Sequence, residues 1–179
     1  MTTPGRPAAL AALGEGRLAG SWTLDPAQSQ VRLATKSMWG LVPVKGVFGQ
    51  VSGSGTVTGS GEVSGTLTVA AASIDTKIKK RDDHLRSADF FDAANHPGIT
   101  FSVQAITPAA GGVTVTGALT VRGTTRQVVF GAAVSGDDST VMLDAELPVN
   151  RADYGLTFNQ LGMMAMKSTI TIHAAFIRQ

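Results

Sequence analysis

The stretch Val113-Thr-Val-Thr-Gly-Ala-Leu-Thr-Val121 places an apolar residue or glycine at every odd position and a threonine or alanine at every even position. This period of two is typical of a β-strand whose two faces have different surroundings. Valine and threonine also favour strands, because branched side chains pack well on a pleated surface. The segment therefore predicts a long β-strand, beyond the about 5–6 residues usual in globular proteins.

The same alternation recurs along most of the chain after Gly20, in residues 31–35, 67–71, 101–105, 141–149 and 170–176. Glycine-rich junctions between these segments are typical of hairpin turns, at residues 59–61, 111–112 and 136–139. Long strands joined by short connections predict an all-β fold, a closed antiparallel up-and-down barrel of about eight strands. A β-sandwich is the alternative, but closure also removes exposed strand edges.

Residues 76–93 break this pattern and predict a short helical flap over one end of the barrel. Asp75 or Thr76 is suited to cap a helix. Three later residues share a helical face by their spacing, namely Ile78, Asp82 and Leu85. Ser87 and Asp89 can cap a further turn that carries two aromatic residues, Phe90 and Phe91. We expect at least one of these two rings to point into the barrel mouth.

Length and composition limit the classes of protein to consider. The chain has 179 residues, of which 43% are apolar and 16% charged, as expected for one folded domain. It has no cysteine, which excludes disulfides, iron–sulfur clusters, thiolate zinc sites and cysteine nucleophiles. A net charge of +2 without a clustered basic face predicts no nucleic-acid partner. No run approaches the about 18 apolar residues of a membrane helix, so we expect no stable membrane insertion.

The first residues predict a flexible N-terminal tail over 1–19, followed by a single domain over 20–179. The tail is rich in alanine, glycine and proline. The alternative is a short helix from Pro7 to Leu13 that packs on the domain. The apolar run Ala8–Leu13 is shorter than the core of a secretory signal, so we expect a cytoplasmic protein.

The polar residues offer weak support for catalysis. The three histidines, His84, His96 and His173, lack the spacing of a helical metal site, so we expect no metal and no cofactor. The enzymatic alternative would act on a lipophilic substrate at the flap, with His84 beside Asp82 or Asp153. The simpler interpretation is that His84 satisfies neighbouring polar groups.

Arginine and aspartate gather in the flap and recur at one strand end. The residues are Arg81, Asp82, Arg86 and Asp89, then Arg151 and Asp153. Paired arginines and aspartates would fix the flap to the barrel rim. Alternatively, one arginine remains to meet an anionic or carbonyl head group.

The strands predict an apolar lumen with room for a ligand. We expect most of its wall to come from seven residues, Phe48, Val69, Phe101, Val103, Val115, Leu119 and Phe130. Aromatic residues are only 6%, and small side chains leave space inside an eight-stranded barrel. Each buried methylene contributes about 0.8 kcal/mol, so a chain of about 15 carbons gains on the order of 10 kcal/mol before the costs of immobilisation.

Several motifs in one order resemble the YceI-like proteins, a family described as polyisoprenoid- or lipid-binding. The resemblance spans about residues 21–177 and is strongest from Ser73 to Asp92, where the chain reads Arg81-Asp-Asp-His-Leu-Arg-Ser-Ala-Asp-Phe-Phe-Asp92. The other matching segments are Trp22-Thr-Leu-Asp-Pro26 with Ser29, Val44-Lys-Gly-Val-Phe48, Pro97 to Phe101, Gly117-Ala-Leu-Thr-Val-Arg-Gly-Thr-Thr-Arg126 and Arg151-Ala-Asp-Tyr-Gly155.

The resemblance implies a lipocalin-like barrel that holds a long apolar ligand and does not imply an enzyme. With the pattern of the strands it nominates these ligand-binding residues: Phe48, Val69, Arg81, His84, Leu85, Phe90, Phe91, Phe101, Val103, Val115, Leu119, Phe130, Arg151 and Tyr154. Two positions depart from the family pattern, because Gln28 and Ser37 stand where relatives often have histidine.

We therefore predict non-catalytic binding, transport or storage of a polyisoprenoid, an isoprenoid quinone or a fatty-acid-like lipid. The alternatives are the enzyme at the flap and a stress-related barrel without a ligand. The sequence does not identify the ligand's head group. It also leaves undecided whether the protein forms a homodimer through an exposed strand or the apolar flap.

Overall fold

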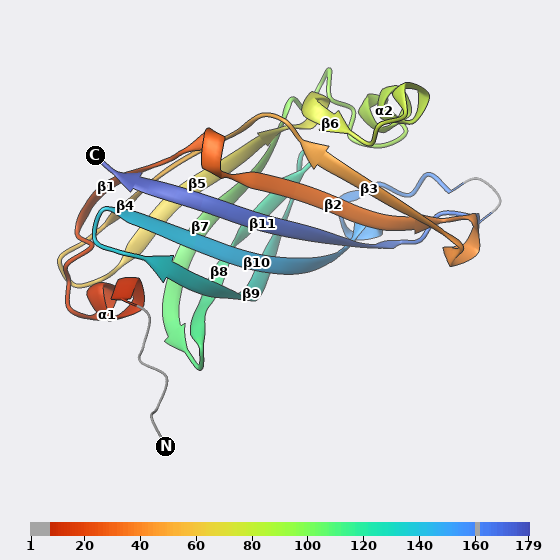
Figure 1. Ribbon diagram of the computed structural model, residues 1–179. Helices are drawn as coiled ribbons and strands as arrows, with labels where there is room; N and C mark the ends of the chain where they lie inside the picture. The colour runs from red at the N-terminus through yellow and green to blue at the C-terminus, as the bar shows by residue number, and fades with distance from the viewer. Residues whose placement is uncertain (1–7, 160–161) are drawn as a thin grey trace.

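The computed structural model describes residues 8–159 and 162–179, and these ranges are mostly antiparallel strands (Figure 1). They contain two α-helices, α1 (Ala8–Gly14) and α2 (Lys79–Arg86). The strands are β1 (Gly20–Leu24), β2 (Gln30–Ser37), β3 (Val42–Phe48), β4 (Val51–Val57), β5 (Val63–Ala70), β6 (Ile74–Asp75), β7 (Gly98–Ala109), β8 (Gly112–Val121), β9 (Thr124–Gly136), β10 (Thr140–Asn150) and β11 (Lys167–Arg178). No helix in the described part is long and apolar enough to span a bilayer.

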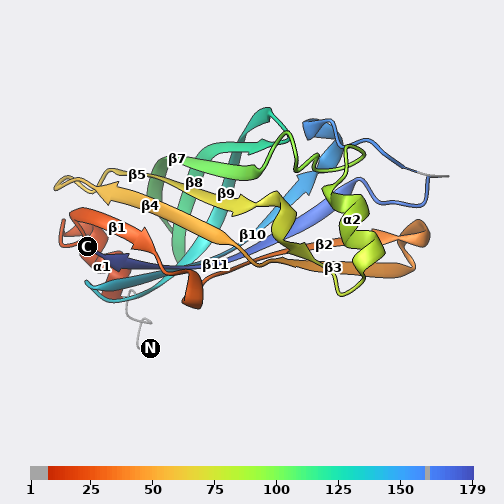
Figure 2. The same cartoon turned by 90° about the horizontal axis from the view of Figure 1, so that it is seen from above.

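The strands form a closed barrel, which confirms the predicted fold. Hydrogen-bonded neighbours follow the order β1-β4-β5-β7-β8-β9-β10-β11, and β11 returns to pair with β1. This ring contains eight strands, with every adjacent pair antiparallel. β2 and β3 extend the wall beyond β1 and β4, and β6 adds to β3 at that end (Figure 2).

Side-chain hydrogen bonds stabilise the short interruption between β1 and β2. A single turn of 3-10 helix, η1 (Pro26–Gln28), separates them, and the Asp25 carboxylate caps it by accepting from Ala27 N at 2.9 Å. Ser29 Oγ donates to Asp25 O at 2.7 Å and accepts from Ala175 N at 3.0 Å. The serine hydroxyl thus replaces a missing backbone partner where the strand changes its pairing along β11.

The predicted turns are present in the structure, but the alternation of faces along β7 differs from the prediction. Residues 59–61, 111–112 and 136–139 connect β4 to β5, β7 to β8 and β9 to β10. In β7, however, a bulge falls between Val103 and Ala105. The extra residue reverses the faces beyond it, so that Ala105 is exposed and Ile106 turns inward.

The N-terminal helix corrects the prediction of a flexible tail over 1–19. Residues 8–14 form α1, which buries Ala9, Leu10 and Ala12, and Leu18 is buried beside it. Leu10 packs with an apolar cluster from β8 and β9, formed by Val113, Val115, Ala132 and Val134. An alanine- and leucine-rich segment becomes helical once one of its faces is buried by packing. Residues 1–7 of the predicted tail lie outside the described residues.

The flap also differs in detail from the predicted 76–93 helix. α2 begins at Lys79, and neither Asp75 nor Thr76 caps it. Ile78 is 51% exposed, so it does not belong to the buried face. Asp82 is buried instead, because its carboxylate accepts from Thr76 N at 2.8 Å and from Thr76 Oγ1 at 2.5 Å.

Leu10→Ala should lower the free energy of unfolding by about 2–5 kcal/mol, the usual cost of truncating a buried leucine. Leu41→Ala is the matched control, since Leu41 is 82% exposed and its truncation should change stability by less than about 0.5 kcal/mol. Urea unfolding followed by circular dichroism measures both. Equal midpoints for the two variants would mean that α1 does not pack on the barrel in solution.

Candidate functional site

The lumen contains two apolar cavities, one toward each end of the barrel. The far cavity lies beside α1 and has a volume of about 150 Å³. The flap cavity lies under the segment that carries α2, Phe90 and Phe91, and has a volume of about 110 Å³. The barrel is therefore not a packed core throughout.

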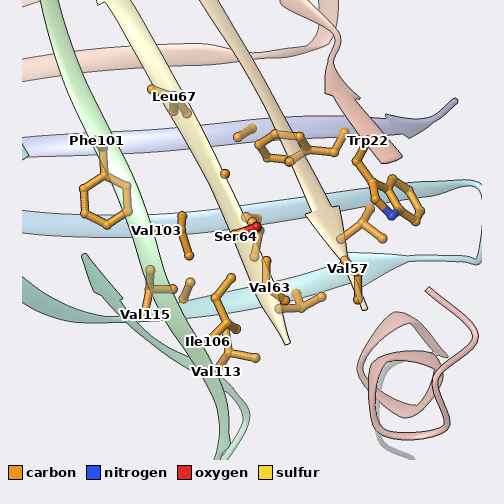
Figure 3. A pocket seen from close by; sticks show the side chains of 18 of the residues that line it. Trp22, Val57, Val63, Ser64, Leu67, Phe101, Val103, Ile106, Val113 and Val115 are labelled. Carbon is orange, nitrogen blue, oxygen red and sulfur yellow. The ribbon is translucent and has the colours of Figure 1, made fainter. Parts of the chain in front are cut away.

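The far cavity is lined almost entirely by carbon. Side chains from the neighbouring strands β5, β7 and β8 line one wall of it, among them Leu67, Val103 and Val115 (Figure 3). The end of the cavity is bounded by Ala9, Leu13 and Leu18 of the N-terminal segment and by Trp22. The described residues of its lining that carry small polar side chains, Ser54, Thr56, Ser64 and Thr66, are all exposed positions of β4 and β5. Such a surface favours a hydrocarbon.

The flap cavity has an apolar body and a polar rim. The body includes Val31, Leu33, Ile99, Val121, Leu147 and Ile170. The polar side chains among its described lining are Thr35, Thr100, Arg151, Tyr154 and Ser168. A molecule with a hydrocarbon chain and one polar end therefore matches this cavity better than the far one.

Two phenylalanine rings stand between the cavities. Phe101 and Phe130 line both, with ring centroids 5.5 Å apart, and we call them the phenylalanine pair. Two aliphatic residues, Leu67 and Ile172, also line both cavities. The ring of Phe101 lies against Gly117, where an added Cβ would approach Phe101 Cζ to 2.4 Å. Because Gly117 has no Cβ, it leaves the space that the Phe101 ring occupies. The sequence motif that contains Gly117 gave no indication of this role.

The structure places the predicted wall residues as follows. Phe48, Val69 and Leu119 line the flap cavity, Val103 and Val115 line the far cavity, and the phenylalanine pair lines both. Leu85, Phe90, Phe91, Arg151 and Tyr154 also line the flap cavity. Neither Arg81 nor His84 lines either cavity.

Arg151 is the buried charge of this site, and backbone carbonyls take the place of the carboxylates that were expected to pair with it. Its guanidinium donates to four carbonyl oxygens, those of Ala165 at 2.9 Å, Leu156 at 2.7 Å, Phe158 at 2.6 Å and Met164 at 3.4 Å. Burial lowers its pKa below the ordinary value, but an arginine remains protonated at neutral pH. No described carboxylate forms an ion pair with it.

Tyr154 also lines the flap cavity and carries a hydroxyl group. It belongs to the turn η4 (Arg151–Tyr154), is 5% exposed, and makes no hydrogen bond to any residue that the structure describes. Burial, together with the negative charge of Asp153, raises the pKa of Tyr154. The hydroxyl is therefore protonated at neutral pH and can donate a hydrogen bond to a ligand.

The flap is held to the barrel by arginines bound to backbone carbonyls. Arg81 Nη2 donates to Thr76 O at 2.9 Å, and Arg86 Nε donates to Ala72 O at 2.7 Å. From the β8–β9 turn, Arg122 donates to Phe90 O at 3.1 Å. The predicted link from Arg81 and Asp82 to Arg151 and Asp153 is absent from these contacts, because both flap residues are engaged by Thr76.

His84 lies on the outside of the flap. Its Nε2 is 2.9 Å from Asp89 Oδ2, and both side chains are about half exposed. Its ring packs edge-on against Phe90, with centroids 5.0 Å apart. The enzymatic alternative required His84 beside Asp82 or Asp153 and open to the lumen, and the structure forms neither pair.

Several lining residues were missed because no local signal marks them. Leu156 and Met164 lie in an irregular segment, where no period indicates which side chain turns inward. Trp22 and Leu18 belong to the far cavity only because α1 docks beside them. Leu147 and Ile172, by contrast, lay in recognised alternating segments and were accessible to the same reasoning as the predicted wall.

Arg151→Lys should lower the free energy of unfolding by at least about 2 kcal/mol, because one ammonium cannot satisfy four buried carbonyls that lie in different directions. Arg126→Lys serves as the control, since Arg126 makes one exposed hydrogen bond, to Asp153 O. Chemical denaturation of both variants provides the comparison. A loss for Arg151→Lys no larger than the control would mean that these four hydrogen bonds to backbone carbonyls contribute little to stability.

Comparisons with known proteins agree with this geometry. A UPF0312 protein of Staphylococcus aureus is 31% identical over 149 residues, which cover 78% of this chain and 84% of that protein. The crystal structure of BcnA from Burkholderia cenocepacia is 28% identical, with a TM-score of 0.77 and coverage of 85% of this chain and 98% of that one.

A polyisoprenoid-binding domain from Saccharophagus degradans shares the fold at 18% identity, with a TM-score of 0.71 and coverage of 88% of this chain and 98% of that one. The model of the YceI-like domain matches residues 22–176, which is nearly the whole barrel from β1 to the end of β11. With that match, the chain belongs to the YceI-like family.

Proposed function

We propose that the protein binds a long-chain isoprenoid or related lipid in the lumen and carries or stores it without chemical change. The observation that carries this proposal is the pair of apolar cavities in one closed barrel, which meet at the phenylalanine pair. The polyisoprenoid-binding domain of the same fold lends support from outside the chain.

The polar rim of the flap cavity supports an orientation for the ligand. Its polar end would lie near Arg151, Tyr154 and Ser168, and its chain would extend toward the far cavity. Arg151 contributes a positive charge and Tyr154 a hydrogen-bond donor, so a carbonyl, hydroxyl or anionic head group would be bound there. Apolar walls distinguish chains that differ by one methylene only weakly, so we expect a range of chain lengths to bind.

The flap supplies the cover for the bound molecule. Phe90 and Phe91 are 3% and 8% exposed and turn their side chains toward the flap cavity. Phe91 packs edge-on against Phe48 on the opposite wall, with ring centroids 6.0 Å apart. Entry and release of a ligand at this end would require these rings to move.

Delipidated protein should bind isoprenoid alcohols, with affinity rising by up to about fourfold for each added methylene until the lumen is filled. Displacement of a fluorescent polyene measures this, and mass spectrometry of the recovered alcohol shows whether it is unchanged. Val115→Trp, which fills the far cavity, should weaken binding of the longest alcohols. Val129→Trp is the matched control, because Val129 lies on β9 and is 60% exposed. Absence of binding by any prenyl or acyl chain would overturn the proposal, and a chemically altered alcohol would favour the enzyme.

Phe101→Ala should join the two cavities, because this ring stands between them against Gly117. The chain length at which affinity stops rising should then increase relative to the unmodified protein. Phe176→Ala is the control, since Phe176 lines the far cavity alone and its truncation enlarges one chamber without joining both. The same series of isoprenoid alcohols is titrated into each folded variant. An identical plateau for Phe101→Ala and the unmodified protein would show that the phenylalanine pair does not limit chain length.

A further inference from the structure

The tip of the β2–β3 hairpin exposes more large apolar side chains than any other described segment. Met38 is 44% exposed, Trp39 64%, Leu41 82% and Val42 41%, so four such residues fall within five positions. The other large apolar residues with high exposure, Ile78, Val129 and Ile177, lie singly on other elements. We call residues 38–42 the apolar tip. A contiguous apolar patch on a protein surface indicates an interaction site.

The backbone of the tip is strained in a way that displays these side chains. Met38 and Trp39 both have positive φ, 50° and 55°, in the left-handed region. Hairpin turns of this geometry usually carry asparagine and glycine, because large side chains are disfavoured there. A methionine and a tryptophan at these two positions cost stability without gaining burial. Strain held at an exposed site supports a functional role for the residues that bear it.

Positive charges lie behind the apolar tip. Lys36 and Lys45 are exposed on β2 and β3, and Lys167 is exposed at the start of the adjacent β11. The strand register places Lys45 opposite Ala34, and Ala34 lies opposite Thr169 on its other side. The ion pairs found among residues 8–159 and 162–179 involve other cations, so none neutralises these three lysines.

The tip lies at the end of the barrel that also carries the flap. Figures 1 and 2 show β2, β3 and α2 reaching one end, with α1 and the C-terminus at the other. Trp39 N donates to Met163 O at 3.1 Å, and the next residue, Met164, lines the flap cavity. Thr35 of β2 lines the same cavity. A surface bound by the tip would therefore adjoin the opening of the lumen.

We propose that the apolar tip docks the protein reversibly on a bilayer that contains anionic phospholipid. Trp39 and Leu41 enter the interface between head groups and acyl chains, where tryptophan is favoured, and Lys36, Lys45 and Lys167 face the lipid phosphates. Charge favours this occupant over a second copy of the chain, because a two-fold contact through the tip would bring two sets of lysines together. Docking goes beyond the proposed function, since it concerns the source of the ligand and requires no cargo to be bound.

Tryptophan fluorescence tests the docking directly. The chain has two tryptophans, and Trp22 is 5% exposed with its Nε1 donating to Leu18 O at 2.9 Å, so a change on docking comes from Trp39. Vesicles of phosphatidylcholine with about 30% phosphatidylglycerol have a surface charge typical of anionic membranes. These vesicles should shift the emission of Trp39 to the blue. Pure phosphatidylcholine vesicles and added salt should weaken the effect.

Matched variants separate insertion from charge. Trp39→Ser combined with Leu41→Ser should weaken vesicle binding at least about tenfold by sedimentation, whereas Val129→Ser removes an equally exposed side chain elsewhere and should bind as the unmodified protein does. Replacing Lys36, Lys45 and Lys167 by glutamine should weaken binding about fivefold for each lysine removed.

Two results would overturn the docking proposal. One is vesicle binding by the Trp39→Ser, Leu41→Ser variant that equals that of the unmodified protein. The other is concentration-dependent self-association that this variant abolishes, which would make the tip a contact between copies. Because the vesicles carry no isoprenoid, either result leaves ligand binding in the lumen as a separate question, answered by the alcohol titrations.

Discussion

Three residue pairs between β1 and β11 close the sheet, and the lumen exists because of that closure. Trp22 lies opposite Arg178, Thr23 opposite Ile177 and Leu24 opposite Phe176. The Arg178 guanidinium also stacks over the Trp22 ring, 5.0 Å from its centroid, and donates to Ala19 O at 2.8 Å. The seam thus joins the first strand, the last strand and the segment after α1. An open sheet of the same strands would expose its edges and could not enclose a ligand.

Once the barrel is closed, the size of the inward side chains decides what space remains. Gly55, Gly65 and Ala174 contribute almost no volume to the far cavity, and Gly117 leaves room for the ring of Phe101. The lumen is therefore divided by a side chain and not by backbone. Such a division can be changed by one substitution without altering strand pairing. The backbone fixes the diameter of the barrel, and a few side chains set how far along it a ligand can extend.

At the flap end, arginine side chains donate to backbone carbonyl oxygens and not to buried carboxylates. Arg151 holds residues 156–158 and 164–165 in this way. Arg86 holds α2 to η3 (Ala71–Ser73) and β6, and Arg122 holds the turn after α2. A guanidinium suits this role because its donors form a rigid fork with several directions. The only buried carboxylate at this end, among the described residues, is that of Asp82, which is fixed by Thr76. The apolar tip lies just beyond this network, so the ordered rim and the exposed hydrocarbon surface are neighbours.

The sequence by itself determined the barrel and most of its wall, because alternation with period two fixes which side chains share a face. It determined neither the bulge after Val103 nor the docking of α1, since both depend on contacts between segments far apart in the chain. Arginine and aspartate recur in the flap and at the barrel rim, so Arg81 and Asp82 were expected to link the flap to Arg151 and Asp153. Only the tertiary structure brought four carbonyl oxygens, from residues 156–158 and 164–165, to the Arg151 guanidinium. It also engaged Arg81 and Asp82 with Thr76 instead.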